Sequence, residues 1–266
     1  MQTRICILAS SSKGNCTVIW NDKHALLIDC GVGIKYFKSA LARLGVDIFT
    51  IRGVLITHLH RDHVNPVLGK ALKRHGIPLY CHADAQLLLE RMHHKSMNGS
   101  TLSFDGTQFV IDCFAVDTFD VPHDCGGGCR GFKISWEHSG LHSLALATDL
   151  AEARQHLIPH FCNLDTLILE SNHDTDMLWN DRIPWILKKR IAESHLSNEQ
   201  CGDFLKQVLL QSQRAPKSIM LAHISQDRNT QELALHSARF ACEAVQADSN
   251  VVISHQREKS QVICID

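Results

Sequence analysis

The sequence lacks long apolar runs and has no excess of charge of either sign. A membrane-spanning helix needs roughly 18 consecutive apolar residues, and no stretch of the 266 residues approaches that length. The first apolar run, Ile5–Ala9, is too short for a secretory signal. With 27 Lys and Arg against 28 Asp and Glu, the net charge of −1 excludes a wholly basic nucleic-acid scaffold, although not a local basic groove. These absences predict a soluble, cytoplasmic protein that makes no membrane contact.

Cysteine is too sparse for a disulfide framework. The chain has 11 Cys, an odd number, among 266 residues, which is below the roughly 8–10% of disulfide-rich domains. We therefore expect mostly reduced, buried cysteines. The sequence shows no repeat, low-complexity stretch or linker, and its hydrophobic content of 44% is ordinary for a globular protein. We predict a single domain over residues 1–266.

Short strand-like runs alternate with helical patterns and come in two batches, each followed by helices. This order predicts an α/β domain of two sheets with helices outside. The segment Thr107–Ala147 has a sequence pattern typical of β-strands. We expect further strands at Arg4–Leu8, Thr17–Trp20, Ala25–Ile28, Val54–Ile56, Leu79–Cys81, Thr166–Leu169, Ser218–Leu221, Val251–Ser254 and Gln261–Ile265. We expect helices at Ile34–Leu44, Pro66–His75, Asp84–Met92, Asn198–Gln211 and Gln231–Gln246.

Histidine is abundant, with 18 in the chain, and its arrangement is more informative than its number. The segment Thr57-His58-Leu59-His60-Arg61-Asp62-His63 directly follows a buried strand. His58 and His60 project to the same side if the extended backbone persists, while Asp62 and His63 belong to the turn or to the start of the next helix. One segment could thus supply ligands to two metal ions about 3.5–4 Å apart. The alternative is a solvated polar loop.

The pattern H-x-H-x-D-H after a buried strand resembles the signature of the metallo-β-lactamase superfamily. The resemblance implies an αββα sandwich, in which two mixed β-sheets are flanked by helices and the metals lie at the sheet edges. It also implies three later ligands, for which His123, Asp149 and His223 stand at the right places. The implied partition is His58, His60, His123 and Asp149 on one metal, and Asp62, His63, Asp149 and His223 on the other.

Further segments resemble one branch of that superfamily, the YycJ (WalJ) family, which is associated with exonuclease activity on DNA. They are Ser10–Cys16, Leu27–Gly31, Leu169–Asp174 and Ser194–Asn198, and the similarity runs from about residue 5 to 264. Asp29 matches an Asp that orients the ligand turn, although it could be only a turn residue. Glu170 and His195 resemble counterparts in the related tRNase Z, where such residues assist proton transfer. His195 is therefore the candidate general acid or transition-state stabiliser, with Glu170 as its support, unless it merely packs against the helix that follows.

The resemblance implies a dinuclear-metal-dependent phosphodiesterase, and it favours 5′-to-3′ digestion of DNA. A hydroxide bridging the two ions would attack phosphorus, Asp62 would orient it, and His195 would assist the leaving alkoxide. Nitrogen and oxygen ligands suit two divalent ions of zinc or manganese, and the ligand types do not separate Zn²⁺ from Mn²⁺.

A DNA substrate, single- or double-stranded, requires a local basic groove on a chain of nearly zero net charge. The densest basic cluster is Lys188-Lys189-Arg190 with Arg182, shortly before His195, and Arg61 lies within the metal turn. Lys70, Lys73 and Arg74 could extend the groove or form a solvated helix face.

Other interpretations stay open at this level. A small-molecule hydrolase of the same fold, such as a glyoxalase-II-like thioesterase or a lactonase, would use the same metal ligands but would not require Glu170 and His195. A non-enzymatic regulatory protein would predict a degraded ligand set. Cys125 and Cys129 could hold a structural zinc, but no second pair completes a tetrahedral site. His173 belongs to a motif without an assigned role, and the remaining histidines, including His94 and His138, are interpreted as surface or packing residues.

Overall fold

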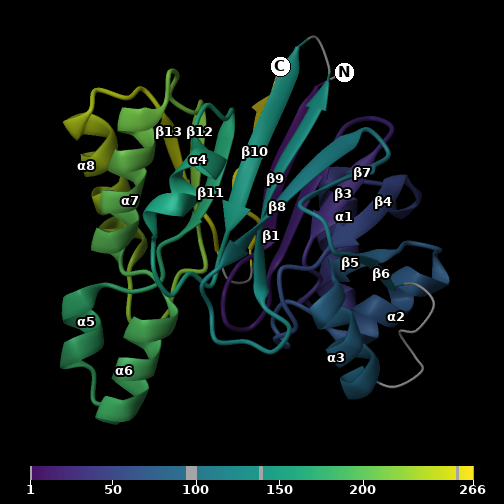
Figure 1. The fold of residues 1–266 in the computed structure, drawn as a ribbon, viewed down its shortest axis with the longest axis horizontal. Helices are drawn as coiled ribbons and strands as arrows, with labels where there is room; N and C mark the ends of the chain where they lie inside the picture. Colours follow the sequence, from purple (N-terminus) through teal and green to yellow (C-terminus); the bar gives the residue numbers. More distant parts are fainter. Residues whose placement is uncertain (1, 94–100, 138–139, 256–257, 266) are drawn as a thin grey trace.

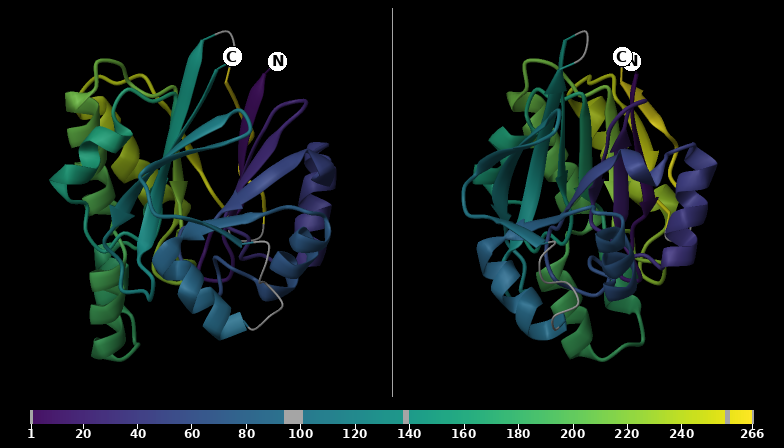
Figure 2. Two further views of the ribbon diagram at one scale, coloured as in Figure 1. Left: turned by 45° about the vertical axis from the view of Figure 1, so that its right-hand side comes forward. Right: turned by 90° about the vertical axis from the view of Figure 1, so that its right-hand side faces the viewer.

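Two seven-stranded sheets pack face to face, and helices cover the outer face of each (Figures 1 and 2). The computed structural model describes residues 2–93, 101–137, 140–255 and 258–265. His94 and His138 lie outside the described residues. No helix of the described part is both long and apolar enough to cross a membrane.

The first sheet pairs the two ends of the chain. Strands β14, β1, β2 and β3 are antiparallel neighbours, and β3 through β6 run parallel. The amino- and carboxyl-terminal strands therefore lie side by side, and the two ends of the chain are drawn close together in Figure 1. In spatial order the strands are β14 (Ile263–Ile265), β1 (Thr3–Ala9), β2 (Cys16–Trp20), β3 (Ala25–Ile28), β4 (Ile51–Leu55), β5 (Leu79–His82) and β6 (Thr101–Phe104).

The second sheet has the same mixed design. Strands β7 to β10 form an antiparallel meander, and β10 to β13 run parallel. In spatial order the strands are β13 (Asn250–Ile253), β12 (Ser218–Ala222), β11 (Thr166–Glu170), β10 (Leu141–Ala147), β9 (Cys129–Glu137), β8 (Phe114–Val121) and β7 (Gln108–Ile111).

Three apolar clusters fill the three interfaces between the four layers. One lies between the sheets, a second packs helices against the first sheet, and a third packs helices against the second sheet. In β1, Ile5 and Ile7 face the other sheet while Cys6 and Leu8 face the helices, as the two-residue period of a strand requires. The first-sheet helices are α1 (Ile34–Leu44), α2 (Pro66–Arg74) and α3 (Ala83–His93); the second-sheet helices are α4 (Ile158–Phe161), α7 (Asn198–Gln211) and α8 (Gln231–Ala244).

Two helices do not join these layers. Helices α5 (Thr175–Asn180) and α6 (Trp185–Ser194) extend beyond the second sheet at the lower edge of Figure 1. Short 3₁₀ turns cover Ile48–Thr50 and Gln155–Leu157. The sequence patterns did not predict α5 and α6, because α6 buries no residue and therefore carries no apolar stripe of the usual kind.

The predicted fold class is confirmed, and most predicted elements occur within one or two residues. Helix α1 has the predicted bounds, and Gly45, which adopts φ 68°, caps its carboxyl end. The last helix ends at Ala244 and not at Gln246, which adopts φ 56° and so cannot continue it. All eleven cysteines are free and seven of them are buried, as predicted.

Candidate metal centre

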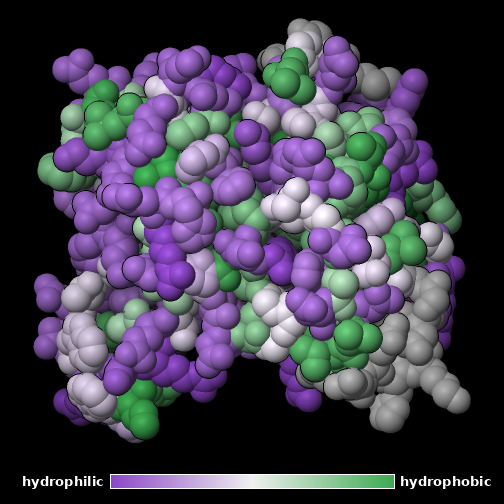
Figure 3. Space-filling view, in the orientation of Figure 1, coloured by the Kyte–Doolittle hydropathy of each residue, from purple (hydrophilic) through white to green (hydrophobic). Residues whose placement is uncertain are grey.

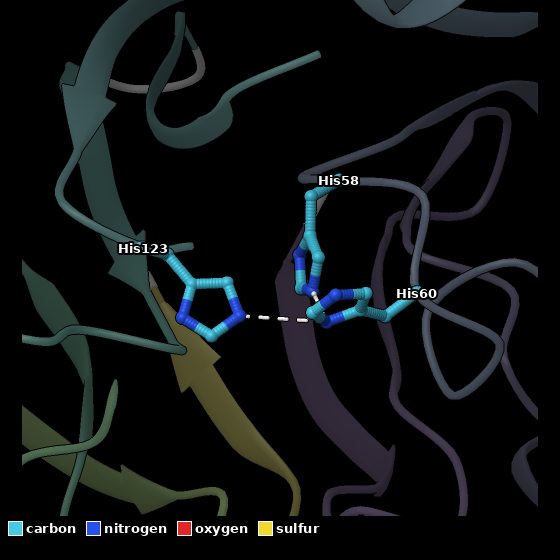
Figure 4. A group of neighbouring side chains, drawn as sticks. All are labelled: His58, His60 and His123. Atoms are coloured by element: carbon cyan, nitrogen blue, oxygen red, sulfur yellow. Dashed lines mark hydrogen bonds between the residues drawn. The ribbon is translucent and has the colours of Figure 1, made fainter. Parts of the chain in front are cut away.

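Three imidazoles converge at the edge of the sheets. Nε2 of His58 lies 3.0 Å from Nδ1 of His60, and Nε2 of His123 lies 3.4 Å from the same atom (Figure 4). Two nitrogens that bind one zinc ion at about 2.0–2.1 Å in a tetrahedron are roughly 3.3 Å apart. The three nitrogens are therefore spaced as ligands of a single ion.

A second group lies beside the first. Oδ2 of Asp62 is 3.6 Å from Nε2 of His63 and 3.9 Å from Nε2 of His223. Asp149 joins the two groups, because its Oδ2 is 3.0 Å from Nε2 of His63 and its Oδ1 is 3.9 Å from Nε2 of His123. The structure thus brings together all seven residues that the resemblance implied as ligands.

A buried polar atom without a hydrogen bond shows that this space fits a cation. Nε2 of His223 is buried and has no hydrogen-bond partner among the described residues. Leaving such an atom unpaired costs about 1–3 kcal/mol, and a divalent ion would satisfy it. The donor set of imidazole nitrogens and carboxylate oxygens suits Zn²⁺ or Mn²⁺ equally.

Thr57 and Asp29 hold the ligand turn from behind. Oδ2 of Asp29 lies 2.7 Å from Nδ1 of His63, and the Thr57 hydroxyl contacts Asp29 at 2.9 Å. That hydroxyl is also 3.1 Å from Nδ1 of His58 and 3.0 Å from Nδ1 of His63. These contacts engage the Nδ1 atoms, so that both imidazoles present Nε2 to the candidate metal centre, the arrangement typical of supported imidazole ligands. The supporting role of Thr57 was not predicted, because nothing in the local sequence pattern distinguishes this threonine from others.

The motif Ser10–Cys16 gains a role that its sequence did not reveal. Nδ2 of Asn15 lies 2.9 Å from Nε2 of His63 and donates to the Asp62 carbonyl oxygen at 3.3 Å. Oδ1 of Asn15 accepts from Ser10 Oγ, which in turn accepts from the His223 backbone N–H at 2.8 Å. Ser10 and Asn15 therefore connect the ligand turn after β4 to the ligand at the end of β12.

Three site residues adopt a backbone conformation that non-glycine residues rarely adopt. Asp29, Asp149 and His223 follow the carboxyl ends of β3, β10 and β12 with φ values of 60°, 59° and 54°. This left-handed conformation costs roughly 1–2 kcal/mol per residue, and such strain gathers at functional sites.

Gly31 makes room for the ligand turn. A Cβ atom at position 31 would lie 1.6 Å from the Asp62 carbonyl oxygen, so any side chain there collides with the turn. We predict that Gly31→Ala lowers the free energy of unfolding by about 1–3 kcal/mol or more, measured by urea denaturation. Gly33→Ala is the matched control, since a Cβ there meets nothing within 4 Å; its cost should stay under about 1 kcal/mol. Equal stability of the two variants would contradict this role of Gly31.

Glu170 supports two histidines at once. Its Oε1 lies 2.6 Å from Nδ1 of His223 and 2.9 Å from Nδ1 of His195. Its Oε2 accepts from the backbone N–H groups of Leu150 and Leu196 at 2.8 and 3.1 Å. The sequence predicted the pairing with His195 but missed the contact with His223. His195 caps the carboxyl end of α6 and does not belong to the start of α7.

The electrostatics of the site differ between its histidines, because some are held neutral and others are held protonated by the buried carboxylates. Burial holds the pKa of His58 well below its usual range and also lowers the pKa of His123, which leaves both imidazoles neutral, as metal binding requires. Burial alone would raise the pKa of Glu170, but His195 and His223 outweigh it and lower that pKa to about 2. Burial opposes a proton on His223, yet Asp149, Asp62 and Glu170 outweigh it and raise its pKa to about 10. Carboxylates that attract a proton this strongly attract a divalent cation by the same field.

Comparison with known proteins agrees with this geometry. Residues 12–129 match a sequence profile described as the metallo-beta-lactamase superfamily. A solved structure of the metallo-beta-lactamase fold protein YhfI from Bacillus subtilis superposes over all of both chains with a TM-score of 0.73 at 16% identity. The chain carries a metallo-β-lactamase domain. The human short-form tRNase Z structure superposes with a TM-score of 0.64 at 18% identity over 99% of each chain.

One curated relative is similar over most of the length of this chain. The exodeoxyribonuclease YycJ of Bacillus anthracis is 28% identical over 237 residues, which are 88% of this chain and 87% of the relative. The predicted superfamily and the predicted similarity to YycJ are thus confirmed. With the candidate His and Asp sites, the match supports a metal-dependent hydrolase of this superfamily.

A cavity of about 690 Å³ opens from the metal centre of this metallo-β-lactamase domain. One wall carries predicted site residues: His60, Asp62, His123, Asp149, His195 and His223. Much of the other wall is α6, from Trp185 to Ser194. Of the predicted basic cluster, Lys189 and Arg190 line this cavity, whereas Lys188, Arg182 and Arg61 do not. Lys188 instead donates to the Trp179 carbonyl oxygen at 2.6 Å.

The cysteine pair and His173 have other surroundings. Sγ of Cys129 lies 3.7 Å from Nδ1 of His58, and among the described residues no candidate metal group includes Cys125 or Cys129. His173 is buried and forms an isolated bridge with Ser197. Its carbonyl oxygen accepts from the Asn198 N–H at 2.8 Å, which helps to position α7 behind Glu170.

Proposed function

We propose that the chain is a dinuclear-metal-dependent phosphodiesterase that removes nucleotides from DNA in the 5′-to-3′ direction. The observation that carries this proposal is the His195–Glu170 pair, joined at 2.9 Å and located beside two candidate metal groups in one cavity. Hydrolysis of a phosphodiester expels an alkoxide, which needs a proton donor. A carboxylate-held imidazole at the edge of a metal site supplies one.

Seven residues would hold the two ions, Mn²⁺ or Zn²⁺: His58, His60 and His123 at one, Asp62, His63 and His223 at the other, with Asp149 between them. When bound, two such ions activate water for attack on phosphorus and neutralise the charge that develops on the phosphodiester. Asp62, whose side chain is 20% exposed, is the more accessible of the carboxylates and would orient the attacking water.

His195 would deliver the proton to the leaving oxygen. Its Nδ1 contacts Glu170, so its Nε2 is the nitrogen available to a substrate in the cavity. Glu170, a buried carboxylate, holds the imidazole in this orientation through its 2.9 Å contact with Nδ1. Such a positioned acid contributes about 10²–10⁴-fold in rate.

The relative named exodeoxyribonuclease YycJ supports DNA as the substrate. Lys189 and Arg190 on the cavity wall supply cations for phosphate contacts, so binding should fall steeply with salt. We further propose that the protein acts in the cytoplasm as a single domain.

The test is digestion of DNA strands labelled at either end, after metal removal by chelation and reloading with Mn²⁺ or Zn²⁺. We expect no activity without metal, recovery with two equivalents, and early release of the 5′ label as a mononucleotide. Release of the 3′ label first would reverse the assigned direction. Intact DNA together with cleavage of a glutathione thioester or a lactone would replace the proposal by a small-molecule hydrolase. Fewer than one metal equivalent after loading would favour a non-enzymatic regulator.

A further inference from the structure

Helix α6 exposes apolar side chains for which the fold has no use. None of its ten residues is buried, and Trp185 and Ile186 are 65% and 76% exposed. Figure 3 shows apolar surface gathered at the lower end of this helix. Adjacent exposed apolar side chains of this size mark a binding surface, because burial of each would otherwise stabilise the fold by about 1.5–3 kcal/mol.

These side chains face the reaction space and not an unrelated surface. Trp185, Ile186 and Arg190 line the cavity of about 690 Å³ whose other wall holds the metal centre. The surface in Figure 3 is notched beside this part of the molecule. His195 immediately follows the last residue of α6, so a ligand on Trp185, at the first turn, lies about 15 Å along the helix from His195 and in the same cavity.

The charges on α6 indicate the chemistry of the ligand. Nζ of Lys189 lies 5.7 Å from the Trp185 ring centroid and 3.5 Å from the Glu193 carboxylate. Arg190 forms no ion pair within the described part of the chain and so offers a free cation to an anionic ligand. A flat aromatic side chain beside an unpaired guanidinium suits a nucleotide, whose base stacks on the ring while its phosphate contacts the cation.

We propose that α6 is a stacking platform for an unpaired nucleobase, with Trp185 beneath the base and Arg190 at a phosphate. This inference rests on the proposed nuclease function and specifies its substrate as a strand with unpaired terminal nucleotides. Bases inside a duplex present their faces only to neighbouring base pairs, so Trp185 can reach a base only where the strand is single or frayed.

The experiment compares two strands that differ only in their terminal bases. One ends in three thymidines, and the other ends in three abasic residues that keep every phosphate. We expect the wild type to bind and degrade the first strand about tenfold to a hundredfold better. Trp185→Ala should remove this preference without changing the binding or degradation of the abasic strand. Trp185→Phe should keep most of the preference. Binding is measured by fluorescence anisotropy and degradation by kcat/KM.

Two controls separate stacking from other effects. Trp179→Ala removes an exposed tryptophan that does not line the cavity. This variant should bind and degrade both strands as the wild type does. Arg190→Ala should weaken binding of both strands equally and reduce the salt slope by about one phosphate contact.

Equal loss on both strands in Trp185→Ala, or a wild type indifferent to the bases, overturns the platform. A dimer that Trp185→Ala dissociates without changing DNA binding also overturns it, in favour of a second copy of the chain on α6. Base-dependent binding without cleavage supports the platform and contradicts the nuclease function instead, so the two failures are distinguishable.

Discussion

Asp149→Ala is expected to abolish activity and to release both metal ions. Asp149 is the only carboxylate that lies between the two candidate groups among the described residues, with contacts to His63 and His123 at 3.0 and 3.9 Å. Loss of a residue that only orients a ligand already weakens metal affinity 10–100-fold. Loss of a ligand shared by both ions should therefore weaken the affinity for each ion by more than about a hundredfold. Metal content by mass spectrometry and DNA digestion measure the two effects.

Asp149→Asn is the matched variant. Asparagine tolerates the φ of 59° at this position better than alanine does, so it preserves the backbone and removes only the charge. Both variants should lose metal, and the asparagine variant should retain the wild-type melting behaviour of the metal-free protein. A variant that keeps two equivalents and normal turnover would show that Asp149 does not bridge the ions.

His195→Ala is expected to lower turnover by about 10²–10⁴-fold while both ions stay bound. Nδ1 of His195 contacts Glu170 at 2.9 Å and lies farther, 3.7 Å, from Oδ1 of Asp149. Because Glu170 engages this nitrogen, removal of the imidazole should spare the metals. The loss should shrink when the leaving group is p-nitrophenolate, because this anion departs without a proton. Comparison of kcat for DNA and for a p-nitrophenyl phosphodiester therefore tests proton donation directly.

Glu170→Gln should behave differently from His195→Ala. Since Glu170 contacts both His195 and His223, its substitution should lower turnover and also weaken metal binding by roughly 10–100-fold. If His195→Ala loses metal to the same extent as Glu170→Gln, His195 is a ligand and not the proton donor.

The proton donor and the proposed binding surface occupy one continuous segment. Helix α6 ends at Ser194 and His195 follows it. Ser197 is the N-cap of α7 and forms a capping box with Gln200. The capped, buried start of α7 gives His195 a rigid anchor on one side, while α6 stands in solvent on the other.

The ligand turn could be predicted because its information is local. His58, His60, Asp62 and His63 lie within six positions after a buried strand, where the period of the backbone places their side chains on a common side. His123, Asp149 and His223 could be assigned only through the resemblance, since a single His or Asp after a strand is usually a cap or a turn residue.

The sequence alone therefore determined the α/β class, the two batches of strands and the four candidate ligands that follow β4. Only the tertiary structure showed that Ser10, Asn15 and Thr57 brace the ligands, that Glu170 serves two histidines, and that α6 walls the cavity. The physical reason is that these roles depend on contacts between chain segments up to 213 positions apart, such as Ser10 to His223. Parallel strands bring their carboxyl ends to one edge, and no local pattern states which ends will meet there.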